Sequence, residues 1–305
     1  MIASKDNTYI DPSVYRKKDN IENKIKMYEG VPVFSLLEFN VFGACNRSCS
    51  FCPVSDTSFY KNVYKGIDIN LYTKIMKELS DINYTGDILY SAFSEPLLNK
   101  EVYDLIKVTK NYLNDVKVEI VSNGDVILKN NLILNKLFDS GLDVLSISIY
   151  DGPENYNLFK SIIANSGLSE SQVILRRRYK VDGNYGITIS NRSGLIDSNK
   201  YRDENEDKVE AIELPLKKPC YYPFYQMVVD YNGDVLLCSH DWKKEKIIDN
   251  ANSSHIFEIW KNEQIKKARL KLKNNSREFL PCYNCDIKGD VMGKRNFDAW
   301  KNIIC

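Results

Sequence analysis

Residues 33–53 read VFSLLEFNVFGACNRSCSFCP, an apolar run that leads directly into three closely spaced cysteines. The run 33–42 is rich in Val, Leu and Phe and predicts a buried strand. Cys45, Cys49 and Cys52 follow it in a C-x3-C-x2-C pattern, with Phe51 just before the last of them. Three thiols in one short loop indicate that they bind a metal centre together.

Beyond this loop, β-rich runs alternate with helical patterns. Further strands are predicted at 87–93, 116–122, 144–150 and 173–179, and helices at 71–82, 101–113, 131–141 and 156–167. Five such alternations are typical of parallel strands joined by right-handed crossovers. An open doubly wound sheet and a partial (β/α) barrel both satisfy this pattern, and in both the functional residues lie at the carboxyl ends of the strands. The cysteine loop is therefore predicted to lie at that end.

The pattern changes after about residue 185. Residues 224–238, FYQMVVDYNGDVLLC, predict a β-hairpin that turns at Asn232-Gly233. A long helix is expected at 256–273, followed by the cysteine pair at 282–285. We therefore divide the chain into an N-terminal arm (1–32), a core (33–190), a polar bridging loop (191–219) and a small α+β unit (220–305).

The composition excludes several classes of protein. The formal net charge is +1, whereas a nucleic-acid binder normally has a marked basic excess. The N-terminus lacks the basic and apolar regions of a secretory signal, and no window approaches the roughly 18 apolar residues of a membrane span. We expect a cytoplasmic protein with neither nucleic acid nor membrane as a partner. Thiols stay reduced in that compartment, so clustered cysteines indicate metal or redox chemistry.

The cysteine loop is an incomplete zinc site. Structural zinc needs four nitrogen or sulfur ligands, and the two histidines of the chain, His240 and His255, are far along the sequence. A 4Fe–4S cluster held by three cysteines instead leaves one iron open to a small molecule.

The loop, with its aromatic Phe51 and its place after a first strand, resembles the signature of the radical S-adenosylmethionine (SAM) superfamily. The resemblance implies an α/β fold with a partial (β/α)6 barrel. It implies that the open iron binds SAM, and that one electron cleaves SAM to a 5′-deoxyadenosyl radical that takes hydrogen from a substrate. It also implies an electron donor such as flavodoxin or ferredoxin.

Further segments at successive strand ends resemble SAM contacts of this family. SAFSEP (91–96) resembles its Gly-Gly-Glu-Pro segment, although Ala-Phe-Ser stands where glycines are usual; VSNG (121–124) and SISIYDG (146–152) resemble its later contacts. In LRRRY (175–179), one arginine can bind a carboxylate bidentately, or all three can be structural. The resemblance implies SAM contacts from Phe51, Ser94, Glu95, Ser122, Asn123, Ser148 and Arg176.

A second set comprises Cys220, Cys238, Cys282 and Cys285. Their spacing alone fits a zinc ribbon or a fully ligated 4Fe–4S cluster. The pattern C-x12-G-x4-C followed by C-x2-C resembles the abbreviated twitch form of the SPASM appendage of radical SAM enzymes. This resemblance implies one auxiliary 4Fe–4S cluster that conducts electrons. Cys305, the last residue, is expected to be a free thiol, with a hydrogen-atom donor or a substitute ligand as alternatives.

Relatives with a twitch unit include dehydrogenases of aminocyclitols. The resemblance thus predicts an oxidoreductase that oxidises a hydroxyl-bearing carbon of a sugar-like or aminocyclitol-like small molecule and passes the second electron to the auxiliary cluster. One alternative is an epimerase in which Cys305 donates the hydrogen atom. The others are a maturase of a ribosomally made peptide, which the short N-terminal arm disfavours, and a non-catalytic Fe–S or zinc protein.

Overall fold

The computed structural model describes residues 12–23, 25–181, 185–187, 189–201 and 212–304. Within these residues, the central sheet has eight strands in the order β10-β9-β8-β3-β4-β5-β6-β7. Its strands are β3 (Leu36–Phe39), β4 (Asp87–Tyr90), β5 (Val118–Ser122), β6 (Val144–Ile149), β7 (Val173–Arg177), β8 (Gln226–Val229), β9 (Asp234–Leu236) and β10 (Ile247–Asn250). The run from β8 to β7 is parallel, and β9 and β10 continue it antiparallel.

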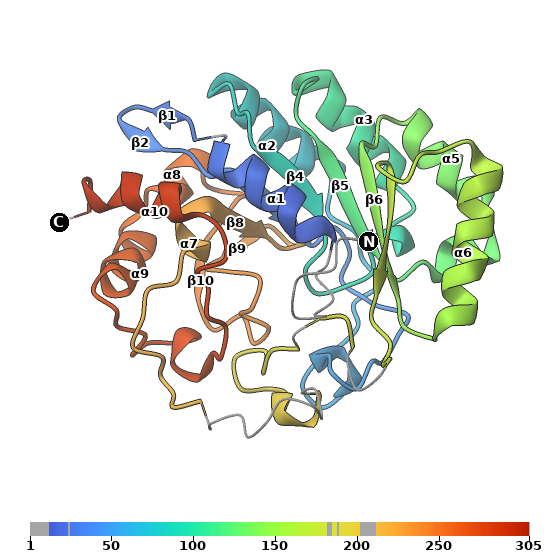
Figure 1. Cartoon of the computed structure of the whole chain (residues 1–305). Helices are drawn as coiled ribbons and strands as arrows, with labels where there is room; N and C mark the ends of the chain where they lie inside the picture. Colours follow the sequence, from blue (N-terminus) through green and yellow to red (C-terminus); the bar gives the residue numbers. More distant parts are fainter. Residues whose placement is uncertain (1–11, 24, 182–184, 188, 202–211, 305) are drawn as a thin grey trace.

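The predicted β–α units are present, and the α/β class with a parallel sheet is confirmed. The connecting helices are α2 (Ile69–Asp81), α3 (Val102–Tyr112), α4 (Asp125–Lys129), α5 (Leu132–Asp139) and α6 (Pro153–Ser166). Figure 1 shows α2, α3, α5 and α6 along the outer side of the curved sheet. The helix expected at 131–141 is shorter and is preceded by α4, because Asn130 between them has an extended backbone.

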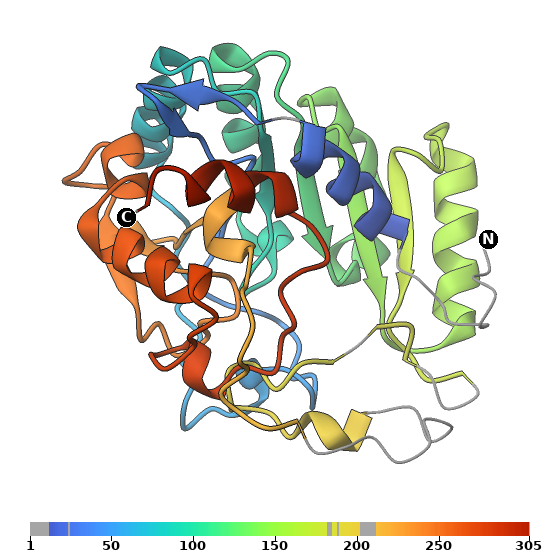
Figure 2. The same cartoon turned by 60° about the vertical axis from the view of Figure 1, so that its left-hand side comes forward.

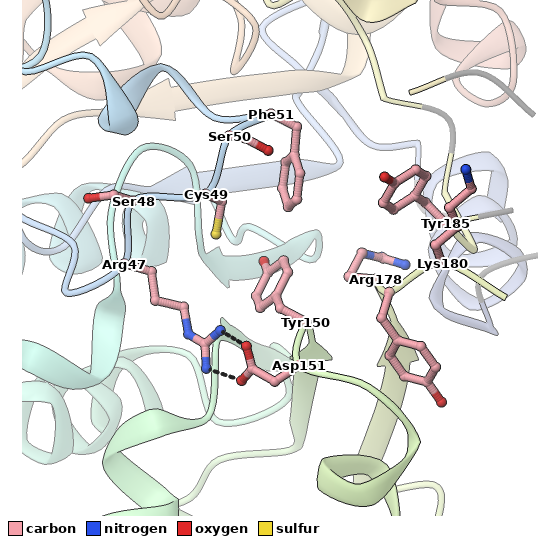
Figure 3. A pocket seen from close by; sticks show the side chains of 11 residues that line it. Arg47, Ser48, Cys49, Ser50, Phe51, Tyr150, Asp151, Arg178, Lys180 and Tyr185 are labelled. Carbon is pink, nitrogen blue, oxygen red and sulfur yellow. Dashed lines mark hydrogen bonds and ion pairs between the residues drawn. The ribbon is translucent and has the colours of Figure 1, made fainter. Parts of the chain in front are cut away.

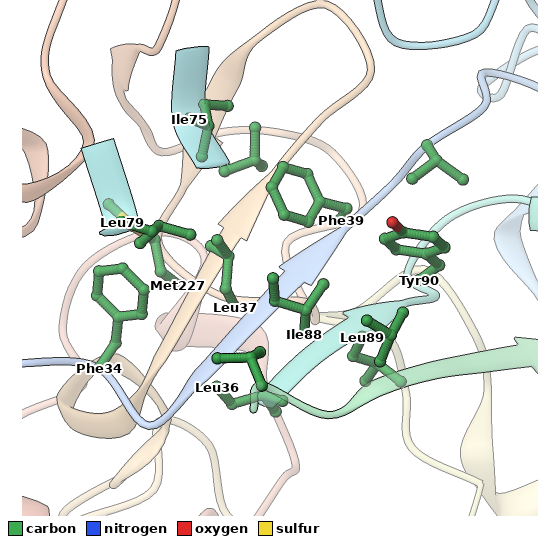
Figure 4. Packing of buried hydrophobic residues seen from close by; sticks show 14 of the residues in the cluster. Phe34, Leu36, Leu37, Phe39, Ile75, Leu79, Ile88, Leu89, Tyr90 and Met227 are labelled. Carbon is green, nitrogen blue, oxygen red and sulfur yellow. The ribbon is translucent and has the colours of Figure 1, made fainter. Parts of the chain in front are cut away.

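The core forms where α2 packs against the first strands. Asp68 begins this helix by accepting hydrogen bonds from the backbone N–H groups of Asn70 (2.8 Å) and Leu71 (3.1 Å), a cap that stabilises a helix by about 1 kcal/mol. The buried helix residues Ile75 and Leu79 then meet Leu37 of β3 (Figure 4). All residues of β3 are buried, as expected for a parallel strand covered on both faces.

The predicted hairpin joins the sheet of the core. Strand β8 pairs with β3 in parallel, and β9 returns antiparallel after the turn at Asn232-Gly233. Gly233 has a φ of +91°, a backbone conformation that suits glycine. A short helix, α7 (Tyr222–Tyr225), lies where the strand was expected to begin. The sixth parallel strand therefore comes from the C-terminal part of the chain and lies on the other side of β3.

The prediction of one helix over 256–273 is wrong. The segment forms α8 (Ile256–Trp260) and α9 (Glu263–Lys273), because the Asn262 side chain caps α9 by accepting from the N–H groups of Gln264 and Ile265. The sequence analysis also missed α10 (Lys294–Lys301). Its Trp300 and Trp260 of α8 enclose the buried guanidinium of Arg269, whose Cζ lies 3.8–3.9 Å from the two ring centroids.

The N-terminal arm contains α1 (Pro12–Asn23), followed by the short strands β1 (Met27–Tyr28) and β2 (Val31–Pro32). Figure 2 shows α1 beside α10 on the inner side of the sheet. Arg16 pairs with Glu119 of β5, and Asn20 donates to Asp87 at the start of β4 (2.6 Å). Helix α1 therefore covers the inner side of the central sheet near the amino ends of β4 and β5. Among the described helices, none has the length and apolar character needed to cross a membrane.

Candidate active site

The first cysteine loop follows β3 and is held by backbone hydrogen bonds. Gly43 N–H donates to Lys65 O (2.9 Å), and Val63 N–H donates to Gly43 O (2.8 Å). A Cβ on Gly43 would lie 2.5 Å from Val63 O, so this close approach requires glycine. Burial raises the pKa of the Cys45 and Cys49 thiols to about 11. The thiols are protonated in the absence of a metal, and they release protons when they bind iron.

Glu95 joins two of the predicted SAM segments. Its side chain accepts hydrogen bonds from the Ser122 hydroxyl (2.8 Å) and from the N–H groups of Asn123 (2.7 Å) and Leu97 (3.0 Å). The residue is only 2% exposed. Burial raises the pKa of Glu95 to about 7, although these hydrogen bonds oppose the shift. The structure thus brings SAFSEP and VSNG together at the carboxyl ends of β4 and β5.

Asn123 and Ser94 connect this centre to its surroundings. The Asn123 amide donates to Asn46 Oδ1 (2.8 Å), which ties the end of β5 to the cysteine loop. The Ser94 hydroxyl donates to Asn40 Oδ1 (2.5 Å), and Asn40 donates to Asp230 (2.7 Å). Ser94 therefore connects SAFSEP to the end of β8.

A pocket of about 380 Å³ lies beside the cysteine loop (Figure 3). Among the described residues, it is lined by Arg47, Ser48, Cys49, Ser50, Phe51, Tyr150, Asp151, Arg178, Tyr179, Lys180 and Tyr185. The rings of Phe51 and Tyr150 are stacked, with centroids 5.8 Å apart and an interplanar angle of 27°. Of the described residues that were predicted to contact SAM, Phe51 is therefore the one that lines this pocket.

Arg47 fixes the loop to two neighbouring strand ends. Its guanidinium donates to Asp125, which follows β5, and to Asp151, which follows β6, with bonds of 2.8 Å to each carboxylate. The pKa of Asp151 is lowered chiefly by its hydrogen bonds from Arg47. The sequence analysis missed these residues. The available signal was an arginine inside the cysteine loop together with carboxylates directly after two strands.

Ser148 and Arg176 are opposite each other on β6 and β7. Ser148 is buried and hydrogen-bonded to Tyr150. Arg176 lies near the charges of α1, since its positive charge helps to lower the pKa of Glu119 and of Lys17. The arginine of LRRRY that lines the pocket is Arg178, which directly follows β7 and lies two residues after Arg176.

The second cysteine set gathers around one small cavity. Cys220 precedes α7, Cys238 follows β9, and Cys282 and Cys285 flank the turn at 283–284; all four line the cavity. The buried Arg277 holds the flanking segments together by donating to the carbonyls of Lys218, Pro219, Ile287 and Lys288. A Cβ on Gly289 would lie 2.3 Å from Cys220 Sγ, so only glycine fits beside this thiol.

The chemistry of the two thiol sets suits iron–sulfur clusters. All seven described cysteines are free thiols; Cys305 lies outside the described residues. In the part of the chain that the structure describes, no three His, Cys, Asp or Glu side chains are grouped as ligands of one metal ion. Thiolates are the usual ligands of 4Fe–4S clusters, one at each iron, so a set of four completes a cluster and a set of three leaves one iron open.

Arg192 lies between the two sets. Burial raises the pKa of Cys52 in the first set, and the positive charge of Arg192 partly opposes that rise. Burial, and after it the charge of Arg192, lowers the pKa of His240, which follows Cys238 in the second set. The guanidinium Cζ is 5.9 Å from the centroid of the Trp242 ring. Arg192 Nε, His240 Nδ1 and Trp242 Nε1 are buried and have no hydrogen-bond partner among the described residues. Such unpaired polar atoms indicate a site that a polar ligand completes.

The sequence analysis missed Arg192 because it assigned this segment to a bridging loop. The backbone at Arg192 (φ +49°) and Ser193 (φ +56°) is left-handed, which non-glycine residues adopt only where surrounding contacts hold them. Those contacts are present. Asn191 N–H donates to Asp286 (2.9 Å), and the Ser193 hydroxyl donates to His240 O (2.9 Å).

Two family models match the chain: the radical SAM superfamily matches residues 39–190, and the SPASM iron–sulfur cluster-binding domain matches residues 220–286. A curated relative is the S-adenosyl-L-methionine-dependent 2-deoxy-scyllo-inosamine dehydrogenase of Niallia circulans. It is 25% identical over 256 residues, which are 83% of this chain and 93% of the relative.

The fold resembles solved structures. The crystal structure of BtrN in complex with AdoMet and 2-DOIA matches with a TM-score of 0.70 and 24% identity, covering 87% of this chain and 98% of that chain. The anSMEcpe structure with bound AdoMet matches with a TM-score of 0.51 and 13% identity, covering 88% and 95% of the two chains.

Proposed function

The chain belongs to the radical SAM superfamily and has a SPASM iron–sulfur domain, and on that premise we propose that it oxidises a hydroxyl-bearing carbon of an aminocyclitol-like or sugar-like molecule to a carbonyl. One observation carries the proposal: Arg192 lies between two cysteine sets, beside buried donors that lack partners. The Niallia circulans dehydrogenase, which aligns with most of this chain, supports the choice of reaction. The comparisons do not favour epimerisation or peptide maturation.

The cysteines divide into two ligand sets. Cys45, Cys49 and Cys52 would hold the 4Fe–4S cluster that binds SAM, and Cys220, Cys238, Cys282 and Cys285 would hold the auxiliary cluster. When bound, SAM with its cluster supplies a hydrogen-atom acceptor, and the auxiliary cluster supplies an electron acceptor. The substrate carbon then loses a hydrogen atom, its hydroxyl loses a proton, and one electron leaves, so that the C–O bond becomes C=O.

The chain's own residues would orient SAM. The Glu95 carboxylate would bind the SAM ammonium, and Ser122 and Asn123 hold that carboxylate in place. The stacked rings of Phe51 and Tyr150 offer an aromatic surface for a planar group such as adenine. Ser94, Ser148 and Arg176 remain proposed contacts at neighbouring strand ends.

The residues between the two cysteine sets would bind the substrate. Arg192 and Trp242 present N–H donors, and the hydroxyl oxygens of a cyclitol or sugar accept such bonds; His240 Nδ1 can donate to or accept from a hydroxyl, according to its tautomer. Burial is the main reason that the pKa of His240 falls to about 3, so its imidazole is neutral near pH 7 and adds no positive charge. A neutral imidazole beside Arg192 suits a hydroxyl-rich small molecule.

We also propose a cytoplasmic location and an electron donor of the flavodoxin or ferredoxin class. Free thiols in all seven described cysteines suit a reducing compartment.

The affinity for SAM is expected to rise with pH. Below about pH 7 the Glu95 carboxyl is protonated in the SAM-free protein, and only the ionised form attracts an ammonium. The Kd for SAM should therefore fall by about tenfold between pH 6 and pH 8 and then level off. Glu95→Gln should weaken binding by about 1.5–3 kcal/mol and remove the pH dependence. Calorimetric titration of the cluster-loaded protein measures both effects, and an unchanged affinity in Glu95→Gln would exclude the ammonium contact.

The function is tested with anaerobically reconstituted protein, SAM, dithionite and a panel of aminocyclitols and sugars. We expect 5′-deoxyadenosine and a ketone in about equal amounts, because each turnover removes one hydrogen atom by way of SAM. An epimerase would instead incorporate deuterium from the solvent at a carbon of the product. This incorporation would be absent in the Cys305→Ala variant. If 5′-deoxyadenosine forms with a peptide but with no small molecule in the panel, the proposed substrate class is wrong.

A further inference from the structure

A basic hollow of about 220 Å³ lies beside the first cysteine loop. Among the described residues, it is lined by Gly43, Phe59, Tyr60, Lys61, Tyr231, Trp242, Lys243 and Lys244. The adjoining segment 61–65, KNVYK, is exposed, and its Tyr64 is 75% exposed. We call the hollow and this segment the lysine hollow. It combines exposed positive charge with aromatic surface.

The lysine hollow is joined directly to the first cysteine loop. Cys45 N–H donates to Asn62 Oδ1 (3.0 Å), and Gly43 exchanges backbone hydrogen bonds with Val63 and Lys65. The aromatic floor also reaches the thiols. Tyr60 and Trp242 belong to a small buried cluster against which Cys45 and Cys52 pack. The aromatic floor of the hollow and these two cysteines therefore belong to one packed cluster.

The positive charge of the lysine hollow is largely unbalanced. Lys61, Lys65 and Lys243 are exposed, and none of them forms an ion pair within the described residues. Some surface lysines elsewhere do pair, as Lys266 does with Glu263 (2.8 Å). Lys244 is neutralised by the buried Asp230. Glu245 and Asp56 are exposed acids close in sequence to residues of the hollow, and Asp56 already accepts hydrogen bonds from Ser58.

We propose that the lysine hollow docks a small acidic redox protein of the flavodoxin class, which delivers electrons to the SAM-binding cluster. This inference rests on the proposed function, because each cleavage of SAM needs one electron from outside. Charge complementarity steers such an encounter, and redox partners form small, transient interfaces. The pocket of Figure 3 meets the loop at Cys49 and Phe51, whereas the lysine hollow meets it at Gly43 and Cys45. Donor and SAM would thus approach different parts of the loop.

The test reverses the charges at three exposed lysines, in the variant K61E/K65E/K243E. The control, K77E/K100E/K267E, makes the same change of net charge at exposed lysines outside the hollow. Binding of a purified, acidic bacterial flavodoxin to the cluster-loaded enzyme is measured by calorimetry at several salt concentrations. We expect the hollow variant to bind about tenfold more weakly and to lose most of the salt dependence, and the control to bind like the wild type.

Cleavage of SAM is then driven either by reduced flavodoxin or by dithionite, which needs no docking surface. In the hollow variant, the flavodoxin-driven rate should fall about tenfold while the dithionite-driven rate is unchanged. Equal losses with both reductants would place these lysines in the SAM site and overturn the proposal, as would an unchanged flavodoxin-driven rate. If the wild type cleaves no SAM with dithionite, the proposed function itself fails. Even then, the docking surface would be supported if the hollow variant binds flavodoxin more weakly and the control variant does not.

Discussion

Replacing Cys45, Cys49 and Cys52 with alanine is expected to abolish SAM cleavage and to remove half of the bound iron. The wild type should hold about eight irons and the triple variant about four, since each proposed cluster has four. The loss should be confined to one cluster because the second cysteine set lies on other segments, which Arg277 holds together. The auxiliary cluster should therefore assemble without the first.

Iron analysis and electron paramagnetic resonance check this expectation, and 5′-deoxyadenosine formation is measured with dithionite. As a control for folding, both proteins are also compared without iron. The far-UV circular dichroism and melting temperature of the cluster-free triple variant should be close to those of the cluster-free wild type. About four irons in the wild type, or zinc in place of iron, would contradict the assignment of two clusters. Residual SAM cleavage in the triple variant would show that the loop does not hold the reactive cluster.

Replacing Cys282 and Cys285 with alanine is expected to separate SAM cleavage from substrate oxidation. Both thiols line the cavity of the second set, so their removal leaves two of its four ligands. SAM cleavage should continue, because the first loop and Glu95 are intact. Ketone formation should fall to background, because the electron that must leave the substrate has lost its acceptor.

The measurement compares 5′-deoxyadenosine with ketone in the same reaction. The wild type should form them in about equal amounts, and the double variant should form the first without the second while retaining about four irons. Cys282→Ser with Cys285→Ser is a second variant of nearly unchanged side-chain volume, which controls for loss of packing. Ketone formation at the wild-type rate in both variants would show that the second set is not the electron acceptor.

Local patterns predicted much of the fold. The alternation of strands and helices is visible because a strand buried on both faces is continuously apolar, while an amphipathic helix repeats every 3.6 residues. Element ends were less accurate. Asn262 divides the expected 256–273 helix by capping a new one, and Asn130 separates α4 from α5. Such breaks depend on single polar side chains. Asparagine favours helix caps over helix interiors, but it also occurs inside helices of this chain, as Asn157 does in α6, so its presence alone does not predict a break.

The site was predicted where its residues are close in sequence. SAFSEP and VSNG end successive strands, and the structure joins them through Glu95, Ser122 and Asn123. Contacts between distant segments were not predicted. Arg47 binds Asp125 and Asp151, and Asn191 binds Asp286, with about 80 to 100 residues between the partners. An arginine in the cysteine loop and carboxylates after two strands were visible in the sequence, but which groups pair is fixed only after the sheet has brought the segments together.

The sequence by itself determined the cofactor chemistry and the α/β class. Three thiols within eight residues stay close in almost any loop conformation, and hydrophobic periodicity is a property of neighbouring residues. The tertiary structure decided that the C-terminal hairpin joins β3, that Arg178 lines the pocket of Figure 3, and that Arg192 lies between the two cysteine sets. It also decided the raised pKa of Glu95. The physical reason is that burial and pairing of polar groups depend on which distant segments pack together, and that packing is a property of the whole fold.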